Sequence, residues 1–532
     1  MLIAYSYPEA TLSRFIFFVL MVLALAGCEA ANNNEGATAT VEPATATAPL
    51  PSPAPAATAT PEPVTLPEPP ARTVMVHLFE WTWPDIALEC ENFLGPTGYV
   101  AVQVSPPQEH LVLPEQPWWQ RYQPVSYQLV SRSGDRAQFA EMVERCAAVG
   151  VDVYVDAVIN HMSGMEEGVG SAGTAFTHYE YPGLYSFDDF YHCGLAANDD
   201  IAHYRDADMV RTCELLNLAD LDLGQEDVRA KVVGYLSDLL SLGVAGFRID
   251  AAKHMYPDQI ATILSQLPGE PYIFQEVIEG AGEPITADEY TSIGDVAEFG
   301  YGQELSRVFR QGTIARLRDL GESALLLPST EAVVFVDNHD NQRGHGSGGG
   351  VLTHEDGALY ELGVVFMLAY PYGYPRVMSS YTFENGDQGP PALEDGSTDP
   401  VYDSGEDEPD CFDGWVCEHR WGPIAGMVGF HNFTSPNLFI SDWWDNGSDQ
   451  IAFGRGDAGF VVINRSEVEL SRTFQTSMAP GEYCNVIEGA LVVEENRLSC
   501  TVPTITVDES GQAEISVAPM RAAALHVGSR LP

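Results

Sequence analysis

Positively charged side chains are scarce in this chain. Its 532 residues include 25 lysines and arginines against 76 aspartates and glutamates, which gives a formal net charge of −51 at pH 7. A charge of this size and sign repels nucleic acid and anionic membranes, so we expect neither as a partner. An uncharged polymer is not repelled. Lysine is the rarer cation, with only Lys231 and Lys253 in the whole sequence.

The amino-terminal apolar stretch is too short to span a bilayer comfortably. Phe15–Gly27 follows Arg14 and suits the apolar region of a signal peptide. It runs into Leu-Ala-Gly-Cys at Cys28, which resembles a bacterial lipobox, in which the cysteine is lipidated after cleavage. The alternative is an ordinary secretory signal with an incidental cysteine. We expect residues 1–28 to be a signal peptide and the protein to be exported by a bacterium, either as an extracellular protein or as a cell-surface lipoprotein.

Residues 29–71 have almost no large apolar side chains. The segment is rich in Pro, Ala and Thr, so it cannot bury a core, and we expect an extended linker. The remaining chain is too long for one ordinary core and predicts two or three domains. It carries eight of the nine cysteines. An even set in an exported protein predicts disulfides, although spacing alone leaves the pairing open.

Polar residues gather at the end of one apolar run. Leu242–Phe247 predicts a buried strand, and Arg248, Asp250, Lys253 and His254 follow it directly. Strand alternation places Arg248 and Asp250 on one face. A cation beside a carboxylate lowers the pKa of that carboxylate and holds it ionised, as covalent catalysis on a sugar requires. For this stretch alone, a structural ion pair at a strand end is the alternative.

Three further apolar runs end in the same way. Asp152–His161 ends in Asn-His, Tyr272–Glu276 ends in Gln-Glu, and Val333–Arg343 contains Asp-Asn-His-Asp. Strands that all carry polar residues at their carboxyl ends are typical of a parallel barrel whose active site lies on that rim. Other expected elements are strands at Val74–His77, Tyr99–Val104, Val151–Val155 and Pro375–Ser379, and a helix at Asp227–Leu242.

Five dense motifs resemble a known family. They are W-W-Q-R-Y-Q-P-V-S-Y (Trp118–Tyr127), D-A-V-I-N-H-M (Asp156–Met162), G-F-R-I-D-A-A-K-H-M (Gly246–Met255), V-D-N-H-D-N-Q-R-G-H-G (Val336–Gly346) and R-V-M-S-S-Y (Arg376–Tyr381). From about Thr73 onward the chain resembles the α-amylases of glycoside hydrolase family 13, in particular the animal-type, chloride-dependent branch. The resemblance implies endo-acting hydrolysis of internal α-1,4-glucosidic bonds in starch and related α-glucans, with retention of configuration.

The resemblance also implies an α/β fold with three parts. Residues 72–160 and 226–436 would form a catalytic (β/α)8 TIM barrel. Residues 161–225, where the strand–helix alternation stops, would form a B domain inserted after strand three. Residues 437–532, with short strands and turns, would form a C-terminal all-β sandwich domain.

The cysteines fit the same resemblance. One family bridge is missing, because Val130 and Ser163 stand at its positions. The resemblance implies the pairs Cys90–Cys146, Cys193–Cys213, Cys411–Cys417 and Cys484–Cys500.

Three carboxylates come from three different strand ends. Asp250, beside Arg248, is the expected nucleophile. Glu276 follows an apolar run, and a partly desolvated glutamate retains a proton near neutral pH, as a general acid must. Asp340 matches the family residue that grips sugar hydroxyls and favours the distorted, oxocarbenium-like state. A retaining mechanism implies that the carboxyl groups of Asp250 and Glu276 lie roughly 5–5.5 Å apart.

Aromatic and histidine side chains are the expected sugar contacts. The aromatic run at Trp118 predicts a platform for glucose rings, and a core aromatic cluster is the alternative. A lone histidine is more often structural, but His161 and His339 match family positions that hydrogen-bond the central sugar, and Asp156 would support the site. The expected substrate contacts are Trp118, Trp119, Tyr122, Gln123, His161, Arg248, Lys253, His254 and His339.

A calcium site is implied where the insertion meets the barrel. Calcium prefers oxygen ligands. Asn160 and Asp220 match family ligand positions, with backbone oxygens from Arg211 and His254. Asp222 is an alternative to Asp220, because the two lie in one acidic segment.

A chloride site is implied by Arg248, Asn338 and Arg376. Two guanidiniums and one amide NH2 present only donors toward a shared point, which suits an anion. The alternative is that the two arginines pair with nearby carboxylates, including Asp250 and Glu276, and bind no ion.

Two other functions are compatible with the motifs. One is a transglycosylase or another α-glucan hydrolase of the same family, which product analysis on starch would separate from an endo-hydrolase. The other is a non-catalytic carbohydrate-binding protein, which this chain disfavours because it keeps all three carboxylates. We expect a monomer that binds starch or another α-1,4-glucan.

Overall fold

The computed structural model describes residues 64–532, except for 323–324, 347–349, 395, 403–407 and 412. The expected signal peptide, with Cys28, and most of the expected linker lie outside the described residues. Residues 64–74 precede the first strand without regular structure. Arg72 Nη1 donates to the carbonyl oxygens of Val149 and Gly150 at 3.0 and 2.9 Å, which joins this segment to the folded chain.

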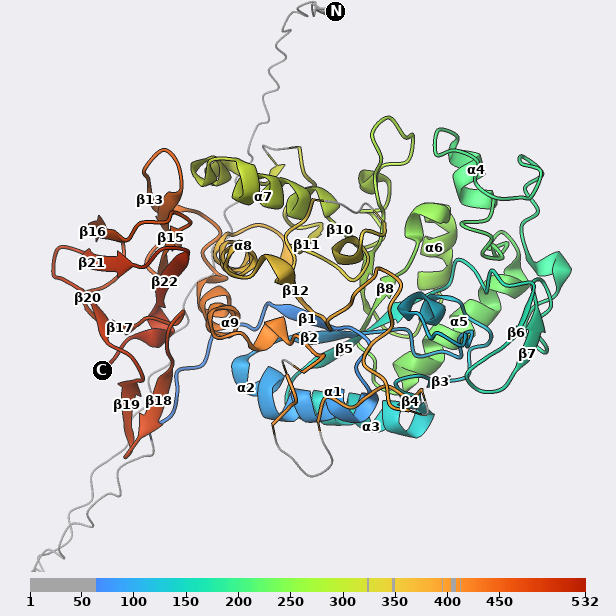
Figure 1. Ribbon diagram of the computed structural model, residues 1–532, viewed down its shortest axis with the longest axis horizontal. Coiled ribbons are helices and arrows are strands. Elements are labelled where there is room, and N and C mark those ends of the chain that lie inside the picture. Colours follow the sequence, from blue (N-terminus) through green and yellow to red (C-terminus); the bar gives the residue numbers. More distant parts are fainter. Residues whose placement is uncertain (1–63, 323–324, 347–349, 395, 403–407, 412) are drawn as a thin grey trace, which may run out of the picture. The chain divides into compact units, whose positions relative to one another are not determined.

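Eight parallel strands form a closed barrel in the hydrogen-bonded order β1-β12-β11-β10-β9-β8-β5-β2 (Figure 1). Their bounds are Met75–Leu78 (β1), Ala101–Val104 (β2), Asp152–Ala157 (β5), Gly246–Ile249 (β8), Tyr272–Gln275 (β9), Asp295–Ala297 (β10), Ala332–Val334 (β11) and Tyr374–Ser379 (β12). The register pairs Asp156 of β5 with Arg248 of β8, so these two charged residues of neighbouring strands stand at the same height. The predicted (β/α)8 barrel is confirmed.

Two expectations about the strands need correction. Leu242–Phe247 is not a strand throughout, because helix α5 (Glu226–Ser241) is followed by a turn in which Gly243 has a φ of 100°, and β8 begins only at Gly246. A short apolar run does not distinguish a buried turn from a strand. Strand β10 has no counterpart among the expected strands, because three residues are too few to give a pattern.

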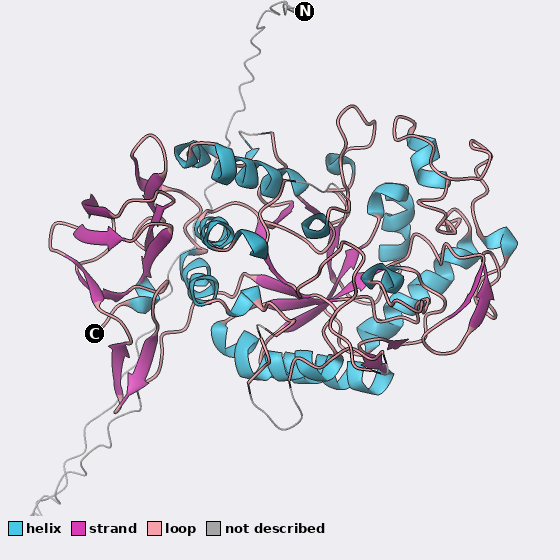
Figure 2. Cartoon of the chain, in the orientation of Figure 1, coloured by secondary structure: helices cyan, strands magenta, loops and turns pink. Residues whose placement is uncertain are grey.

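Helices flank the barrel strands (Figure 2). Helix α3 shows why the local sequence starts a helix: the Asp135 carboxylate accepts hydrogen bonds from the backbone N–H groups of Ala137 and Gln138, and the Gln138 side chain accepts one from the Asp135 N–H. The longer helices around the barrel are α1 (Trp83–Glu89), α3 (Arg136–Ala148), α5, α6 (Pro257–Leu264), α7 (Phe299–Gln311), α8 (Ala358–Ala369) and α9 (Gly422–Thr434).

The segment between β5 and α5, where an inserted domain is expected, contains only short elements. Lys231, on the barrel helix α5, contacts this segment. Its Nζ lies 3.3 Å from Asp189 Oδ1 and 4.6 Å from the centre of the Tyr185 ring. The regular elements of this segment are β6 (Glu167–Val169), β7 (Ala175–Thr177), a 3-10 turn (Phe187–Asp189) and α4 (Ala207–Thr212).

Antiparallel strands follow α9. One sheet has the order β13-β14-β15-β22 and another β16-β21-β20-β17, and apolar side chains such as Phe460, Phe474 and Leu525 form a core between them. This arrangement confirms the predicted all-β C-terminal part. The strands are β13 (Ser441–Asp445), β14 (Gln450–Gly454), β15 (Gly459–Asn464), β16 (Leu470–Gln475), β17 (Gly481–Cys484), β18 (Leu491–Glu494), β19 (Arg497–Cys500), β20 (Thr504–Val507), β21 (Gln512–Val517) and β22 (Arg521–His526).

All four expected disulfides are formed. They link Cys90 to Cys146, Cys193 to Cys213, Cys411 to Cys417, and Cys484 to Cys500. The Cys193 bridge lies in the inserted segment and the Cys484 bridge in the C-terminal sheets, so each part of the fold carries its own covalent link.

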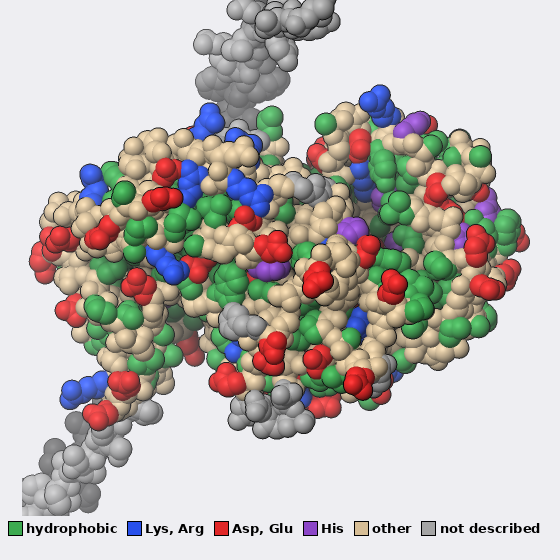
Figure 3. Space-filling view, viewed as in Figure 1, with side chains coloured by type: hydrophobic (Ala, Val, Ile, Leu, Met, Phe, Trp, Pro, Cys, Tyr) green, Lys and Arg blue, Asp and Glu red, His purple; other side chains and the backbone are tan. Residues whose placement is uncertain are grey.

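Acidic side chains are spread over the face shown in Figure 3, whereas basic ones are few. This distribution matches the net charge of −51. Among the residues that the structure places, no helix is long and apolar enough to cross a membrane.

A buried ion network joins α1 to a segment more than 300 residues later in the chain. Glu89 is fully buried and accepts hydrogen bonds from His419 Nε2, from Arg420 Nε and Nη2, each at 2.7 Å, and from the Tyr402 hydroxyl. Burial raises the pKa of Glu89, but the hydrogen bonds and charges of His419 and Arg420 outweigh it and hold that pKa at about 2. The ionised carboxylate therefore stabilises the native state.

Glu89→Ala should lower the free energy of unfolding at pH 7 by about 3–5 kcal/mol, because it leaves the partly buried Arg420 cation without its carboxylate partner. The folded pKa lies below the unfolded value, so this contribution is complete above about pH 4.5 and is lost as the pH falls toward about 2. Urea denaturation across this range measures both effects. Asp238→Ala is the control: it breaks an exposed ion pair with Arg136 and should cost less than about 1 kcal/mol. Equal losses for the two variants would contradict the assignment.

Candidate active site

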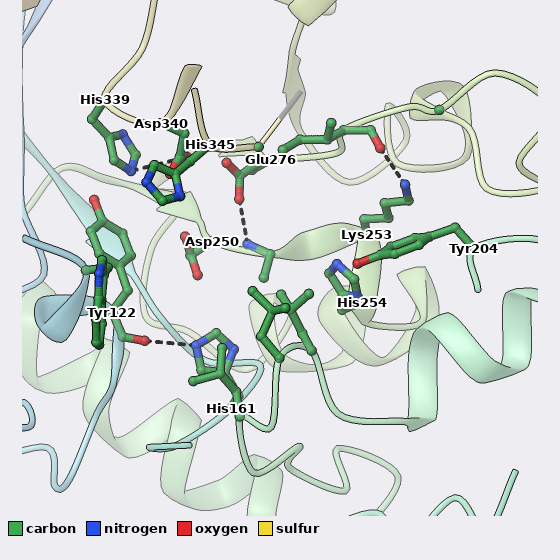
Figure 4. Close-up of a pocket in the computed structure, with 18 of the residues that line it drawn as sticks. Tyr122, His161, Tyr204, Asp250, Lys253, His254, Glu276, His339, Asp340 and His345 are labelled. Carbon is green, nitrogen blue, oxygen red and sulfur yellow. Dashed lines mark hydrogen bonds and ion pairs between the residues drawn. The ribbon is translucent and has the colours of Figure 1, made fainter. Parts of the chain in front are cut away.

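A cavity of about 760 Å³ opens at the carboxyl ends of the barrel strands. Figure 4 shows Asp250, Glu276 and Asp340 converging on one space within it. Eleven of the sequence-predicted residues line this cavity, whereas Arg248 lies beneath it, only 1 % exposed. The predicted residues in the wall are Trp118, Trp119, Tyr122, Gln123, His161, Asp250, Lys253, His254, Glu276, His339 and Asp340.

Arg248 binds three carboxylates at the floor of the cavity. Its Nη1 donates to Asp156 Oδ1 at 2.5 Å and to Asp250 Oδ1 at 2.8 Å. Its Nη2 lies 2.5 Å from Glu276 Oε1, an ion pair without hydrogen-bond geometry. The predicted pairing of Arg248 with Asp250 is confirmed, and the two carboxylates expected to flank the scissile bond share one guanidinium.

The backbone holds Glu276 from its other side. Glu276 Oε2 accepts a hydrogen bond from the Ala251 N–H at 3.0 Å. Ala251 has φ 50° and ψ 31°, a left-handed conformation that costs a non-glycine residue about 1–2 kcal/mol. Because this residue directly follows Asp250, one strained turn presents a carboxylate and a backbone donor to the same site. Such strain persists only where the surrounding structure enforces it.

Burial outweighs Arg248 at Asp250. Burial raises the pKa of Asp250 well above its usual value, and the charges of Glu276 and Asp156 raise it further, whereas Arg248 lowers it. The expected effect of Arg248, a lowered pKa at Asp250, is therefore present, but burial and the neighbouring carboxylates outweigh it. Burial and the charge of Glu276 also raise the pKa of Asp340 to about 7.

The histidines of the cavity wall are held by backbone carbonyls. His161 Nε2 contacts the Tyr122 carbonyl oxygen at 2.9 Å, and His161 Nδ1 lies 3.3 Å from Asn160 Nδ2. Both ring nitrogens of His161 thus have partners, and this geometry leaves neither for the expected sugar hydrogen bond. His254 Nδ1 contacts the Val210 carbonyl oxygen at 3.0 Å, which leaves Nε2 for the cavity. Burial lowers the pKa of each ring to about 4, so both are neutral at pH 7.

The expected aromatic platform is partly a wall of the core. Trp118 is only 4 % exposed and meets the rings of Tyr122 and His339 edge-on at 5.7 and 5.5 Å. Tyr122 stacks on His339 at 5.1 Å, and its hydroxyl donates to Asp156 at 2.8 Å. Trp119 is the more exposed indole, and its N–H donates to Asp387 Oδ1 at 3.2 Å. Trp118 and Tyr122 therefore pack as the core alternative describes, and Trp119 is the tryptophan of the run with the more accessible ring.

Other cavity residues come from irregular segments. Lys253 Nζ lies 2.5 Å from Glu283 Oε2 and 2.6 Å from the Ile278 carbonyl oxygen, with the Tyr204 ring at 4.8 Å. These partners have no strand-end motif, so the sequence carries no signal for them. His345 could have been found, because it lies in the fourth family motif. The wall residues absent from the prediction are Tyr204, Leu215, Leu216, Leu218, Ala251, Ile278, Glu279, Gly280, Glu283, His345 and Gly346.

The predicted calcium side chains meet where the insertion joins the barrel. Asn160 Nδ2 lies 3.1 Å from Asp220 Oδ1, and Asp220 is 2 % exposed, without an ion pair in the described part of the chain. Burial raises the pKa of Asp220 well above its usual value, and the charges of Glu214 and Asp222 add to this. Asp222 is more exposed and accepts hydrogen bonds from its own turn. A cation would therefore relieve Asp220 more than Asp222.

The other two predicted calcium ligands could act through backbone oxygens. The Arg211 side chain is engaged elsewhere, because its Nη2 lies 2.9 Å from Glu289 Oε2. Arg211 and His254 stand in the last turns of short helices, where carbonyl oxygens lack intrahelical partners. No three His, Cys, Asp or Glu side chains of the described chain form a metal-binding group by themselves. A calcium ion here would thus depend on the Asn160 amide oxygen and on carbonyls.

The predicted chloride residues all lie inside the barrel, each no more than 2 % exposed. Arg376 Nη1 donates to Gln103 Oε1 at 2.9 Å, and Arg376 forms no ion pair with a described residue. Burial and the charge of Arg248 lower the pKa of Arg376 to about 10. Asn338 Oδ1 accepts a hydrogen bond from the Asn341 N–H. The carboxylate-pairing alternative therefore holds for Arg248 but not for Arg376, which fits an anion.

Known proteins resemble this chain over most of its length. Residues 120–275 match the family described as "Alpha amylase, catalytic domain", and residues 441–528 match "Alpha amylase, C-terminal all-beta domain". An α-amylase of Pecten maximus is 45 % identical over 487 residues, covering 87 % of this chain and 94 % of the relative. Human α-amylase 1B is 46 % identical over 479 residues, covering 84 % of this chain and 92 % of the relative.

Solved structures agree. A mutant of α-amylase I from Eisenia fetida in complex with maltohexaose is 40 % identical, with a TM-score of 0.80 over 88 % of this chain and 100 % of that one. A barrel with carboxylates clustered on its carboxyl rim, followed by an all-β domain, defines a glycoside hydrolase. Within that class, the chain belongs to the α-amylase family. It is an enzyme for the endo-hydrolysis of α-1,4-linked glucans.

Proposed function

We propose that Asp250 and Glu276 carry out this hydrolysis by a retaining double displacement. The observation that carries the proposal is the sharing of the Arg248 guanidinium, which brings both carboxylates to the floor of the cavity. Asp250 would attack the anomeric carbon and form a glycosyl ester, while Glu276 gives a proton to the departing oxygen. Glu276 would then take a proton from water, whose oxygen attacks the anomeric carbon and releases Asp250.

The remaining groups would bind and orient the glucan. Asp340 reaches the same space from the segment that follows β11 and would accept hydrogen bonds from sugar hydroxyls. Trp119 offers an exposed ring face for a glucose ring, and the free Nε2 of His254 offers an acceptor. Lys253 is held by Glu283 at the cavity edge, where its ammonium group could donate to a neighbouring sugar. Starch and related α-glucans are the proposed partners, with the protein acting as a monomer.

Asp250→Asn and Glu276→Gln should each lower turnover of soluble starch by at least about 10²-fold, because each removes the nucleophile or the acid without changing the side-chain volume. Asp238→Asn, in an exposed position on α5, is the matched control and should keep full activity. More than a few per cent of wild-type activity in either active-site variant would contradict the roles. NMR of the first products separates the alternatives: a transglycosylase would give longer glucans, and a retaining hydrolase gives the α-anomer.

We also propose that calcium joins the insertion to the barrel. The support is the buried Asp220 carboxylate beside Asn160, which has no cationic partner among the described residues. Asn160 and Asp220 would supply side-chain oxygens, and Arg211 and His254 would supply backbone oxygens. The ion would act by holding these elements together, because it offsets a buried negative charge.

Exhaustive chelation should lower the melting temperature, because an ion that binds only the folded chain stabilises it by about 2.7 kcal/mol at 100 times its Kd. Calorimetry with and without added calcium measures this. Asp220→Asn should melt at the same temperature in both conditions, whereas Asp222→Asn should still respond. A wild-type melting temperature that is unchanged by chelation would rule out a structural calcium.

We propose further that Arg248, Asn338 and Arg376 bind chloride. The support is that Arg376 is a buried cation without an ion pair among the described residues. An anion beside Arg248 would compete with Glu276 for the guanidinium and offset its charge. That would favour the protonated form of Glu276, which the acid role requires.

Removing chloride should therefore shift the alkaline limb of the pH–activity profile to lower pH and reduce turnover near neutral pH, while glucan binding changes less. Arg376→Gln should abolish this response, and it should also abolish any rise of the melting temperature on chloride titration. An unshifted alkaline limb in halide-free buffer would refute the chloride site and leave the hydrolase function standing.

We propose that the protein is exported and tethered to a membrane through a lipid on Cys28, with residues 29–71 as the linker. The four disulfides support an oxidising, extracytoplasmic location. The lipid rests on the Leu-Ala-Gly-Cys sequence alone. Expressed in a bacterium, the protein should partition into the detergent phase, and Cys28→Ser should move it to the aqueous phase. Detergent partitioning that persists in the variant would contradict the tether.

A further inference from the structure

Arg343 is a buried cation close to the active site that has no expected role. It is 7 % exposed and follows Asp340 by three residues. Its guanidinium carbon lies 4.9 Å from the ring centre of Phe79, 4.5 Å from that of Tyr381 and 4.4 Å from that of Phe383. Its Nη1 donates to the His339 carbonyl oxygen at 3.0 Å. The cation therefore sits in a three-sided aromatic box with one backbone anchor.

This environment is costly for a charged group. Arg343 forms no ion pair with a described residue, and its Nε and Nη2 have no hydrogen-bond partner there. Burial lowers the pKa of Arg343. Cation–π contacts with three rings offset part of the desolvation. A hydrocarbon side chain would fill the box without this cost, so packing alone does not account for an arginine here.

The contacts of Arg343 close the turn that carries two cavity residues. Asp340 is the last residue before the 3-10 turn Asn341–Arg343, and its carbonyl oxygen accepts the backbone N–H groups of Arg343 and His345, each at 3.0 Å. The Arg343 side chain reaches back to His339. Arg343 is thus bonded to both residues of the pair: its side chain to the His339 carbonyl oxygen and its backbone N–H to the Asp340 carbonyl oxygen.

We propose that Arg343 is a positioning residue for hydrolysis: it locks the turn that aims Asp340 into the cavity. The inference rests on the proposed role of Asp340 in gripping the sugar. Asp340 faces charged or titratable groups from every neighbouring element, and Arg343 is one of only two arginines among those that act on it most strongly. These groups are Tyr122, Asp156, Arg248, Asp250, Glu276, His339, Arg343 and His345.

The electrostatics support the geometry. Burial and the negative charge of Glu276 raise the pKa of Asp340 to about 7, while Arg248 and Arg343 lower it. Without Arg343, one of these two opposing cations is lost, so the pKa of Asp340 rises further. A group that must be ionised sets the acid limb of the pH profile, and that limb would move to higher pH.

The test compares Arg343→Met with Arg343→Lys on a defined malto-oligosaccharide. Arg343→Met fills the box but removes the charge, so kcat should fall by about 10²-fold while KM changes less, and the acid limb should move up. Arg343→Lys keeps the charge and one donor, so it should stay within about tenfold of wild type with an unshifted acid limb. Arg472→Met is the matched control, because Arg472 stacks on Trp444 at 4.8 Å in the C-terminal sheets, and it should leave both readouts unchanged.

Melting temperatures separate misfolding from mispositioning. If Arg343→Met does not fold, Phe383→Leu removes one wall of the box and should lower kcat in the same direction by a smaller factor. A kcat within twofold of wild type in both Arg343→Met and Phe383→Leu would overturn the inference. Equal losses of kcat in Arg343→Met and Arg343→Lys, with an unmoved acid limb, would overturn it as well. Asp340→Asn is measured in parallel: full activity there would instead overturn the proposed role of Asp340.

Discussion

The active site depends on one guanidinium buried in a barrel of parallel strands. Arg248 enters from β8 and meets carboxylates from β5, from the end of its own strand and from β9. These carboxylates keep the pKa of Arg248 well above its usual value. Removing the Arg248 side chain would leave several buried carboxylates without a partner, which would strongly lower the stability of the folded state. The catalytic floor and the polar interior of the barrel are therefore one structure, and neither can be altered separately.

Two buried arginines in the same barrel interior have different partners. Arg248 has three carboxylates, whereas Arg376 has a neutral amide from Gln103. That amide is itself oriented, because its NH2 group donates toward Asp156 while its oxygen accepts from Arg376. Burial lowers the pKa of both cations. At Arg248 the nearby carboxylates outweigh burial and raise the pKa, whereas at Arg376 burial and the charge of Arg248 outweigh the carboxylates.

Much of the fold and site could be predicted because the chemistry stands at strand ends. Asp250, Glu276 and Asp340 each follow an apolar run. The resemblance to the family also implied the four disulfide pairs. What could not be predicted depends on three-dimensional burial. The net pKa direction at Asp250 reflects how many carboxylates meet there, and the orientation of His161 is set by a carbonyl brought from another segment. Strand β10 and the cavity residues around Glu283 lie in segments with no periodic pattern.

The scarcity of lysine makes this protein unusual material for bioconjugation. The side chain of Lys253 is 7 % exposed and bonded within the cavity, so it reacts slowly with an amine-directed reagent. Lys231 on α5 is about a third exposed and is the one other lysine in the sequence. Once any free α-amino group is blocked, a succinimidyl ester would therefore label essentially one side chain, and a carrier activated for amines would hold every attached molecule by the same helix. Covalent immobilisation, which usually scatters attachment points over a surface, would here be close to uniform.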